Sequence, residues 1–382
     1  MTLMRFPWQA FPALVLVFLA LFSPAWTVAE LNATGQSGLS YPYEIARALI
    51  LSLAGLSVLA ILFRPAPLME AALLLVFVHA GAWLLISGIS GAEGQALSAF
   101  WCVLAALWLC AWRLATVLSD VKVADGLAGA LIRFLVPALF GIWILILWEA
   151  IVRGAGIPFI LLPPPSAIGA KFAASIPILA ADVWQTIFKS VLAGYLLGCG
   201  AGFVVAILAD RFLFLRRGLM PIGNMVSALP IIGVAPVMVM WFGFDWHSKA
   251  AVVVLMTFFP MLVNTVAGLA AAGHMERDLM RTYAADYRQT LVKLRLPAAA
   301  PFIFNALKIN STLALIGAIV AEFFGTPVVG MGFRISTEVG RMNVDMVWAE
   351  IAVAALAGSL FYGLLAYIER AVTFWHPSVR GG

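Results

Sequence analysis

Charged residues are scarce in this chain of 382 residues. Asp, Glu, Lys and Arg make up only 11% of the sequence and apolar residues 64%, whereas roughly a quarter of a soluble domain is charged. This excludes a water-soluble fold. The alternation over about 10 residues that is typical of outer-membrane barrel strands is also missing. What recurs instead is apolar runs of about 20 residues, the length with which a helix crosses the hydrocarbon layer.

Groups that hold metals, form disulfides or carry out catalysis are equally sparse. The three cysteines, Cys102, Cys110 and Cys199, lie inside apolar runs, where a thiol behaves as a small hydrophobe. The four histidines show no ligand-like spacing, and the sequence contains no Ser/His/Asp, HExxH or GxxxxGK[ST] pattern. We therefore expect no metal, no cofactor bound by this chain and no enzymatic activity of its own.

The hydropathy pattern predicts an all-α polytopic membrane protein with about ten transmembrane helices. The predicted spans lie near 8–29, 44–63, 67–89, 96–118, 128–152, 184–208, 219–243, 249–272, 300–323 and 347–369. The first could also be a signal peptide cut after Ala29. An uncleaved span is favoured because its apolar stretch is long for a signal peptide.

The distribution of Lys and Arg predicts the orientation. With a cytoplasmic amino terminus, sixteen of the 23 cations fall on the inside, as the positive-inside rule requires. Both termini are then cytoplasmic. The net charge of +5 is explained by inside loops beside anionic membrane lipid, without a nucleic-acid partner.

A polar stretch at 119–127 divides four spans from six. The predicted organisation is an N-terminal four-helix membrane module at 1–118, a cytoplasmic linker at 119–127 and a second domain at 128–382. Polar residues in the front spans are few, and Glu70 and His79 are the exceptions. Between the fifth and sixth spans, three consecutive prolines before Ser166 predict an extended segment, followed by an interfacial helix near 166–176.

The longest inside loop, at 273–299, combines five cations with an amphipathic pattern. Leu279, Met280, Tyr283 and Tyr287 recur at helical spacing and predict an apolar stripe along a helix. Such a helix either lies on the membrane surface or docks in the groove of a cytosolic partner.

The second half of the same loop carries two boundary signals. Asp286 with Gln289 predicts the cap of a second short helix. Pro297 then ends the unit, where the chain is expected to turn back into the membrane.

The sequence resembles the permeases of ABC importers, specifically the group that serves nitrate, sulfonates, taurine and pyrimidine-type precursors. Their cytoplasmic loop carries the EAA signature. Here Asp278 stands at its acidic position, Ala284 at its glycine and Leu294 to Pro297 at its terminal Leu-Pro element. The resemblance covers about 128–380. Further matching segments are Leu162–Ser166, Leu229–Gly243, Pro297–Lys308, Val320–Gly325, Glu369–Arg370 and Trp375–Pro377.

The signature has two departures. Leu279 and Met280 replace its alanine pair, and Ala284 replaces its glycine. The alanine argues against a left-handed backbone at the turn, because a Cβ there costs stability.

The resemblance implies a type I ABC-importer permease core of six helices in the bacterial inner membrane. It also implies a homodimer, a separate ABC ATPase subunit that holds ATP and Mg, and a periplasmic or lipid-anchored solute-binding protein. The residues expected to couple to the ATPase are Asp278, Leu279, Arg281, Tyr283, Ala284, Arg288, Leu296 and Pro297.

Polar residues inside spans are the candidates for a solute path, because they are costly in hydrocarbon. The candidates are Asn224, Ser227, Met238, Trp241, Asn264, Asn310 and Glu322. For each of them the alternative is a hydrogen bond between packed helices. Glu322 is either a gate or solute contact, or the partner of a loop-stabilising ion pair with Arg334 or Arg341.

The expected cargo is a pyrimidine- or flavin-like vitamin precursor, because the segment Thr312–Phe323 resembles permeases for such heterocycles and few cations line the path. A sulfonate, taurine or nitrate importer is the alternative. A secondary transporter driven by an ion gradient is the alternative of another class. It would require acidic or histidine relays in the spans and an inverted repeat, and the sequence shows neither clearly.

Overall fold

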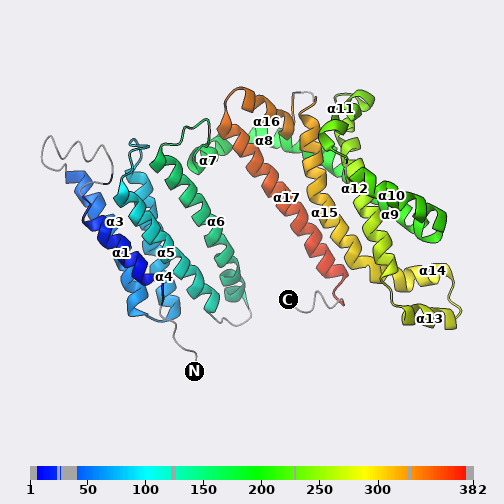
Figure 1. The fold of residues 1–382 in the computed structure, drawn as a ribbon, viewed down its shortest axis with the longest axis horizontal. Coiled ribbons are helices and arrows are strands. Elements are labelled where there is room, and N and C mark those ends of the chain that lie inside the picture. Colours follow the sequence, from blue (N-terminus) through cyan, green and yellow to red (C-terminus); the bar gives the residue numbers. More distant parts are fainter. Residues whose placement is uncertain are drawn as a thin grey trace. The chain divides into compact units, whose positions relative to one another are not determined.

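The computed structural model describes residues 7–23, 26, 41–121, 126–227, 229–325 and 328–375. The elements of these residues are helices, and the chain divides into two compact units, Met1–Ile168 and Gly169–Gly382 (Figure 1). The division falls after the linker predicted at 119–127, because the helix that follows this linker packs in the first unit.

The first unit is built from five helices around one apolar core. They are α1 (Ala10–Leu21), α3 (Tyr41–Phe63), α4 (Pro67–Gly88), α5 (Ser98–Asp120) and α6 (Leu127–Ala155). Helix α5 is its centre and packs against the other four. Glu70, the acidic residue in a predicted front span, is buried. Its charge is balanced by Arg113, whose Nε donates a 2.7 Å hydrogen bond to it.

The second unit alternates long and short helices. The chain runs through α7 (Pro165–Ala174), which spans the division, then α8 (Ile176–Val183), the π-helix η1 (Trp184–Val191), α9 (Leu192–Arg211), α10 (Leu213–Ser227), α11 (Ile231–Phe242), α12 (Trp246–Ala270), α13 (His274–Thr282), α14 (Tyr287–Thr290), the π-helix η2 (Leu291–Arg295), α15 (Leu296–Glu322), α16 (Met331–Gly340) and α17 (Val344–Val372). Helix α7 lies where the interfacial helix was predicted. In Figure 1, α13 and α14 lie at one end of this unit and α16 at the opposite end.

Eight helices in the described residues are long and apolar enough to cross a membrane, which confirms an all-α polytopic membrane protein. Two shorter apolar helices, α1 and α11, lie within the predicted spans 8–29 and 219–243. The predicted span at 219–243 is interrupted at Pro230, whereas Pro236 lies inside α11. Helix α10 ends at Ser227 and α11 begins at Ile231, because Pro230 is extended, with ψ of 116°, and has no N–H to donate.

The chain does not turn at Pro297, which corrects a second expectation. One helical rod runs from Tyr287 to Glu322, and Pro297 lies in the first turn of α15. The rod widens just before the proline, where the N–H of Leu296 donates to the carbonyl of Leu291 five residues back. A π-turn of this kind is frequent at functional sites.

Helix α12 lies at the centre of the second unit, packed along both α9 and α15. Gly194, Gly198 and Gly202 form one stripe of α9, and the missing side chains let the two backbones approach closely. A Cβ on Gly198 would lie 2.1 Å from Oγ1 of Thr257. One on Gly202 would lie 2.5 Å from the carbonyl oxygen of Phe258.

We predict opposite effects for two alanine substitutions two residues apart on α9. Gly198→Ala should destabilise the protein by roughly 1–3 kcal/mol, because α9 and α12 must separate to admit the methyl group. Gly200→Ala is the matched control, since nothing lies within 4 Å of a Cβ there and alanine favours a helix. Thermal unfolding in detergent should show a lower Tm for the first variant only, and equal Tm values would contradict this close packing.

Candidate functional sites

The loop at one end of the second unit presents a short amphipathic helix. In α13, Leu279 is 55% exposed and Tyr283, the residue that ends the helix, is 78% exposed. Met275 is also exposed on α13. Large apolar side chains at this exposure are costly in water. The apolar stripe of Leu279 and Tyr283 is therefore a candidate interaction surface.

The turn after α13 has the left-handed backbone that the sequence argued against. Ala284 has φ of +51°. The N–H of Ala284 donates to the carbonyl of Arg281 and that of Ala285 to Met280, both at 2.9 Å, which is the pattern of a Schellman cap. The expectation for Ala284 is therefore wrong, because these two hydrogen bonds hold the turn despite the cost of a Cβ at positive φ.

The cap predicted for the second short helix is confirmed. The side chain of Asp286 accepts from the N–H of Gln289 at 2.6 Å, and the side chain of Gln289 accepts from the N–H of Asp286 at 3.0 Å. This reciprocal box begins α14 and fixes the angle at which the loop re-enters the rod.

A partly buried ion pair ties this re-entry to the end of α9. The guanidinium of Arg295 donates to both oxygens of Asp210, at 2.7 and 2.6 Å, and its Nε donates to the carbonyl of Leu269 at 2.9 Å. The hydroxyl of Tyr287 also donates to Asp210 at 3.1 Å, and Arg211 covers the ring of Tyr287 at 4.7 Å. The guanidinium group of an arginine can donate to both oxygens of one carboxylate. This cluster of Asp210, Arg295 and Tyr287, the Asp210 clamp, therefore fixes the start of the rod.

Sequence reasoning missed Asp210. In the sequence, Asp210 stands out only as an acidic residue beside Arg211 in an otherwise basic inside loop. The hydropathy pattern does not show that it contacts Arg295, which lies 85 residues later in the chain.

The other predicted coupling residues are spread along the loop. Asp278 and Arg281 form an exposed ion pair at 3.2 Å, a type that contributes little. Arg288 is exposed on α14. Leu296 packs with Leu269 and Leu291 in a small apolar cluster, so it anchors the loop instead of extending the exposed stripe.

At the opposite end of the unit, three side chains satisfy the first N–H groups of α16. The N–H of Gly330 donates to Asp182 at 2.6 Å, and the next two N–H groups donate to Thr186 Oγ1 at 2.9 Å and to Glu322 at 2.8 Å. Thr186 in turn donates to Glu322 at 2.8 Å. A helix N-terminus without such acceptors would leave orphan donors. This cluster of Asp182, Thr186 and Glu322, the α16 cluster, therefore fixes the start of α16.

The ion pairs considered for Glu322 are not formed. Arg334 instead binds Asp182, with Nε 2.8 Å from Oδ2, and Arg341 pairs with Glu338 at 3.2 Å. The hydrogen bond to Asp182 raises the pKa of Arg334. Glu322 is 1% exposed and holds α16 through the hydrogen bonds described above.

Two of the candidates for a solute path make hydrogen bonds within the packed helices. Asn310 is fully buried and donates to the carbonyl of Thr257 at 2.8 Å and to Sγ of Cys199 at 3.2 Å, so it links three helices. Asn264 donates to the carbonyl of Pro260 one turn earlier, at 2.8 Å. The side chains of Asn224 and Ser227 lie outside the described residues.

Met238 and Trp241 border an open apolar groove of about 520 Å³ between α9, α11 and α12. Trp241 is 70% exposed. A smaller cavity of about 140 Å³ lies at the break between α10 and α11, beside Leu229, Pro260 and Leu313. The structure brings neither Glu322 nor Asn310 to the lining of these two spaces.

Comparison with known proteins places this arrangement in a family. Residues 194–374 match the family model described as the binding-protein-dependent transport system inner membrane component. The formylaminopyrimidine transport permease protein of Halalkalibacterium halodurans is 31% identical over 243 residues, which cover 63% of this chain and 95% of that protein. The riboflavin transport system permease protein of Chloroflexus aurantiacus is 27% identical over 238 residues, 62% of this chain and 88% of its own. The taurine transport system permease protein of Escherichia coli is 26% identical over 252 residues, with 62% and 88% covered.

The chain is thus a multi-pass membrane permease. It belongs to the binding-protein-dependent ABC-transporter permeases, the family that the EAA-like loop indicated. The matched residues include most of α9, the exposed loop, Asp210 with Arg295, and Glu322 with α16, whereas Asp182 and Thr186 lie before the matched segment.

We predict that Asp210→Asn loosens the loop, because it leaves the guanidinium of Arg295 without its countercharge in a partly buried site. The cost should be on the order of 3 kcal/mol. Hydrogen exchange of the amides at 287–296 should quicken, and Tm should fall. Asp278→Asn in the same loop removes only an exposed pair, worth under about 0.5 kcal/mol. If the two variants exchange alike, Asp210 does not hold the loop.

Proposed function

We propose that this chain is the translocation subunit of an ATP-driven importer and that its exposed loop docks a separate ABC ATPase subunit. The apolar stripe of Leu279 and Tyr283 supports this most directly, because the Asp210 clamp holds it in place at the end of the unit. A surface helix needs no such clamp. An amphipathic helix presented rigidly fits the groove of a partner.

The same loop leads into the rod that ends at the α16 cluster. Arg295 lies in the third turn of the segment Tyr287–Glu322, and Glu322 lies at its far end. A second rod, Ile176–Arg211, which comprises α8, η1 and α9, also has polar contacts towards both ends, with Thr186 bound to Glu322 and Asp210 bound to Arg295. We therefore assign to these two rods the transmission of ATPase motion from the loop to the outer helix α16.

The remaining partners follow from this assignment. The sequence has no GxxxxGK[ST] loop, so ATP and Mg belong to the ATPase subunit. One unit supplies one docking loop and a pair of ATPases requires two, which supports a homodimer. A periplasmic or lipid-anchored binding protein would deliver solute to the outer face, and both termini would be cytoplasmic. For the domains, we propose an added membrane module at 1–118, joined through 119–127 to a permease domain at 128–382 whose first helix, α6, packs in the first compact unit.

Replacing Leu279 or Tyr283 with Asp should disrupt docking. Placing an unpaired charge in an apolar groove costs several kcal/mol, enough to lower ATPase occupancy more than about a hundredfold. Co-purification of the ATPase in detergent, with the mass of the complex, measures this, and the wild type should give two copies of each subunit.

Met275→Asp is a useful comparison, because Met275 is also exposed on α13 but lies one turn further from the clamp. It should weaken docking less. Retention of both co-purification and transport-stimulated ATP hydrolysis in the Leu279 and Tyr283 variants would refute docking by this stripe.

For the cargo, we propose a neutral or weakly charged heterocycle of the pyrimidine or flavin type. The spaces beside the α10–α11 break and beside Trp241 are apolar-walled, with His247 as the one titratable group among their lining residues. Relatives named for formylaminopyrimidine and riboflavin transport support this class, whereas a relative named for taurine transport supports the sulfonate alternative.

Uptake competition in proteoliposomes with the binding protein and ATPase separates the two classes. Excess formylaminopyrimidine or riboflavin should lower uptake of a labelled heterocycle, and excess taurine should not. Trp241→Ala should lower uptake while leaving ATPase co-purification unchanged, because this side chain lies on the apolar groove and not on the docking loop. Strong competition by taurine alone would overturn the cargo assignment and leave the transporter assignment standing.

A further inference from the structure

Glu350, in the second turn of α17, is a buried carboxyl that no donor reaches. Its side chain is fully buried, and within the described residues neither of its two oxygens has a hydrogen-bond partner. A carboxylate in such a place would keep its charge without water and without a donor, which is very costly in a protein interior. A buried carboxyl without donors takes up a proton instead and becomes neutral.

The carboxyl beside it, Asp182 of α8, has the opposite environment. Its Oδ1 accepts from the N–H of Gly330 at 2.6 Å, and its Oδ2 accepts from Nε of Arg334 at 2.8 Å. Nη2 of Arg334 donates to Oδ1 at 3.5 Å. Asp182 therefore has a guanidinium as its countercharge, and it is the ionised member of the two.

The two carboxyls lie within hydrogen-bonding reach of each other. Two carboxylates at such a range repel strongly, so they do not both ionise. A protonated Glu350 can instead donate its O–H to Asp182. A carboxylate has about four acceptor positions, and the donors of Gly330 and Arg334 occupy three of them, which leaves one for Glu350.

The charges around the pair are one proton short of balance. Helix α17 packs against α8, α15 and α16, and α12 adds one further charge to the group. The five side chains are Asp182, Glu322, Glu350, Arg334 and Lys249. Three carboxyls against two cations leave one negative charge, and one bound proton removes it. The carboxyl without donors is the place for that proton.

The other charged groups nearby cancel in pairs. Glu338 of α16 faces Arg334, but it is paired with Arg341 at 3.2 Å. Asp345, in the first turn of α17, pairs with Lys171 at 3.6 Å. Neither pair changes the balance around Glu350.

We propose that Asp182 and Glu350 form a proton-binding site at the end of the second unit where α16 lies. Glu350 holds the proton and donates it in a hydrogen bond to Asp182. The ligand is a proton and not a metal cation, because no three ligand-type side chains of the described residues come together to hold a metal ion. The bound proton lets α17 pack against α8 and α16, since an ionised Glu350 would repel Asp182.

Infrared spectroscopy of the full-length permease detects this proton, because a protonated carboxyl absorbs apart from a carboxylate. Spectra are recorded in a maltoside detergent, which has no carbonyl group, at about pH 7, where exposed Asp and Glu are ionised. A protonated-carboxyl band should be present in the wild type and missing from Glu350→Gln. Glu338→Gln is the matched control. It removes a buried carboxyl of α16 that has an ionic partner, and it should leave the band in place.

The pH dependence of stability gives a second measurement. Glu350→Gln copies the neutral glutamate and keeps a donor towards Asp182, so it should fold and elute like the wild type. In the unfolded wild type, Glu350 is ionised above about pH 5, so folding takes up a proton. Raising the pH then favours unfolding by up to about tenfold per pH unit. Glutamine does not titrate, and the Tm of the wild type should therefore fall relative to that of Glu350→Gln as the pH rises.

Absence of the protonated-carboxyl band from the wild type, or its persistence in Glu350→Gln, would overturn the proposal. Loss of the folded peak of Glu350→Gln on size exclusion would also overturn it, because the negative charge of Glu350 would then be required. A difference in Tm between wild type and Glu350→Gln that does not change with pH would mean that folding takes up no proton at Glu350, with the same consequence.

Discussion

The packing of α12 against α9 is the constraint on which the second unit depends. Three glycines at four-residue spacing remove the side chains between the two helices, and the backbone carbonyls of Ala250 and Phe258 take up the space. Without an aqueous hydrophobic effect between helices, close van der Waals contact of this kind supplies much of the association energy in a membrane. The position of α15, which packs on the other side of α12, follows from it.

Polar side chains then fasten this apolar frame at its two ends. At the loop end, Asp210 holds Arg295 and Tyr287, and at the opposite end Thr186 and Asp182 hold the first turn of α16 together with Glu322. A buried donor or carboxylate without a partner is expensive, so each cluster has one preferred geometry. The exposed loop and α16 thus lie at the two ends of one connected set of helices.

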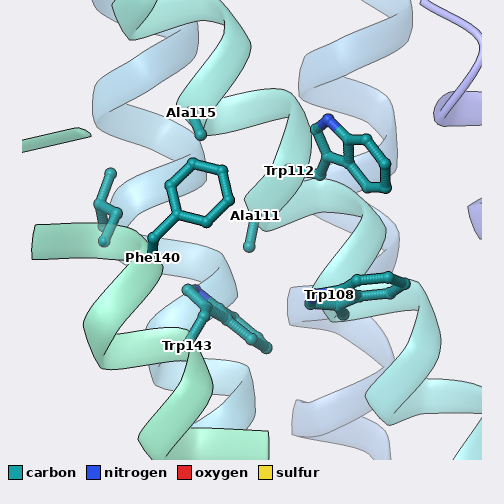
Figure 2. A pocket seen from close by; sticks show the side chains of 7 residues that line it. Trp108, Ala111, Trp112, Ala115, Phe140 and Trp143 are labelled. Atoms are coloured by element: carbon teal, nitrogen blue, oxygen red, sulfur yellow. The ribbon is translucent and has the colours of Figure 1, made fainter. Parts of the chain in front are cut away.

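The first unit is built on a different principle. Its core is a single apolar cluster around α5, and Glu70 is neutralised by Arg113 within the unit. An aromatic-lined space of about 300 Å³ lies between α5 and α6 (Figure 2).

The sequence by itself determined the class of protein, because composition and apolar run length leave few alternatives to a helical membrane fold. It also determined the amphipathic loop and the Asp286–Gln289 cap, since both depend on residues within one or two helical turns. Only the tertiary structure decided the partners of Glu322, the role of Asp210 and the buried position of Asn310, because each depends on residues at least 50 positions away. The left-handed turn at Ala284 and the rod that continues through Pro297 were also decided in three dimensions. There, hydrogen bonds and helix packing outweigh the local preferences of alanine and proline.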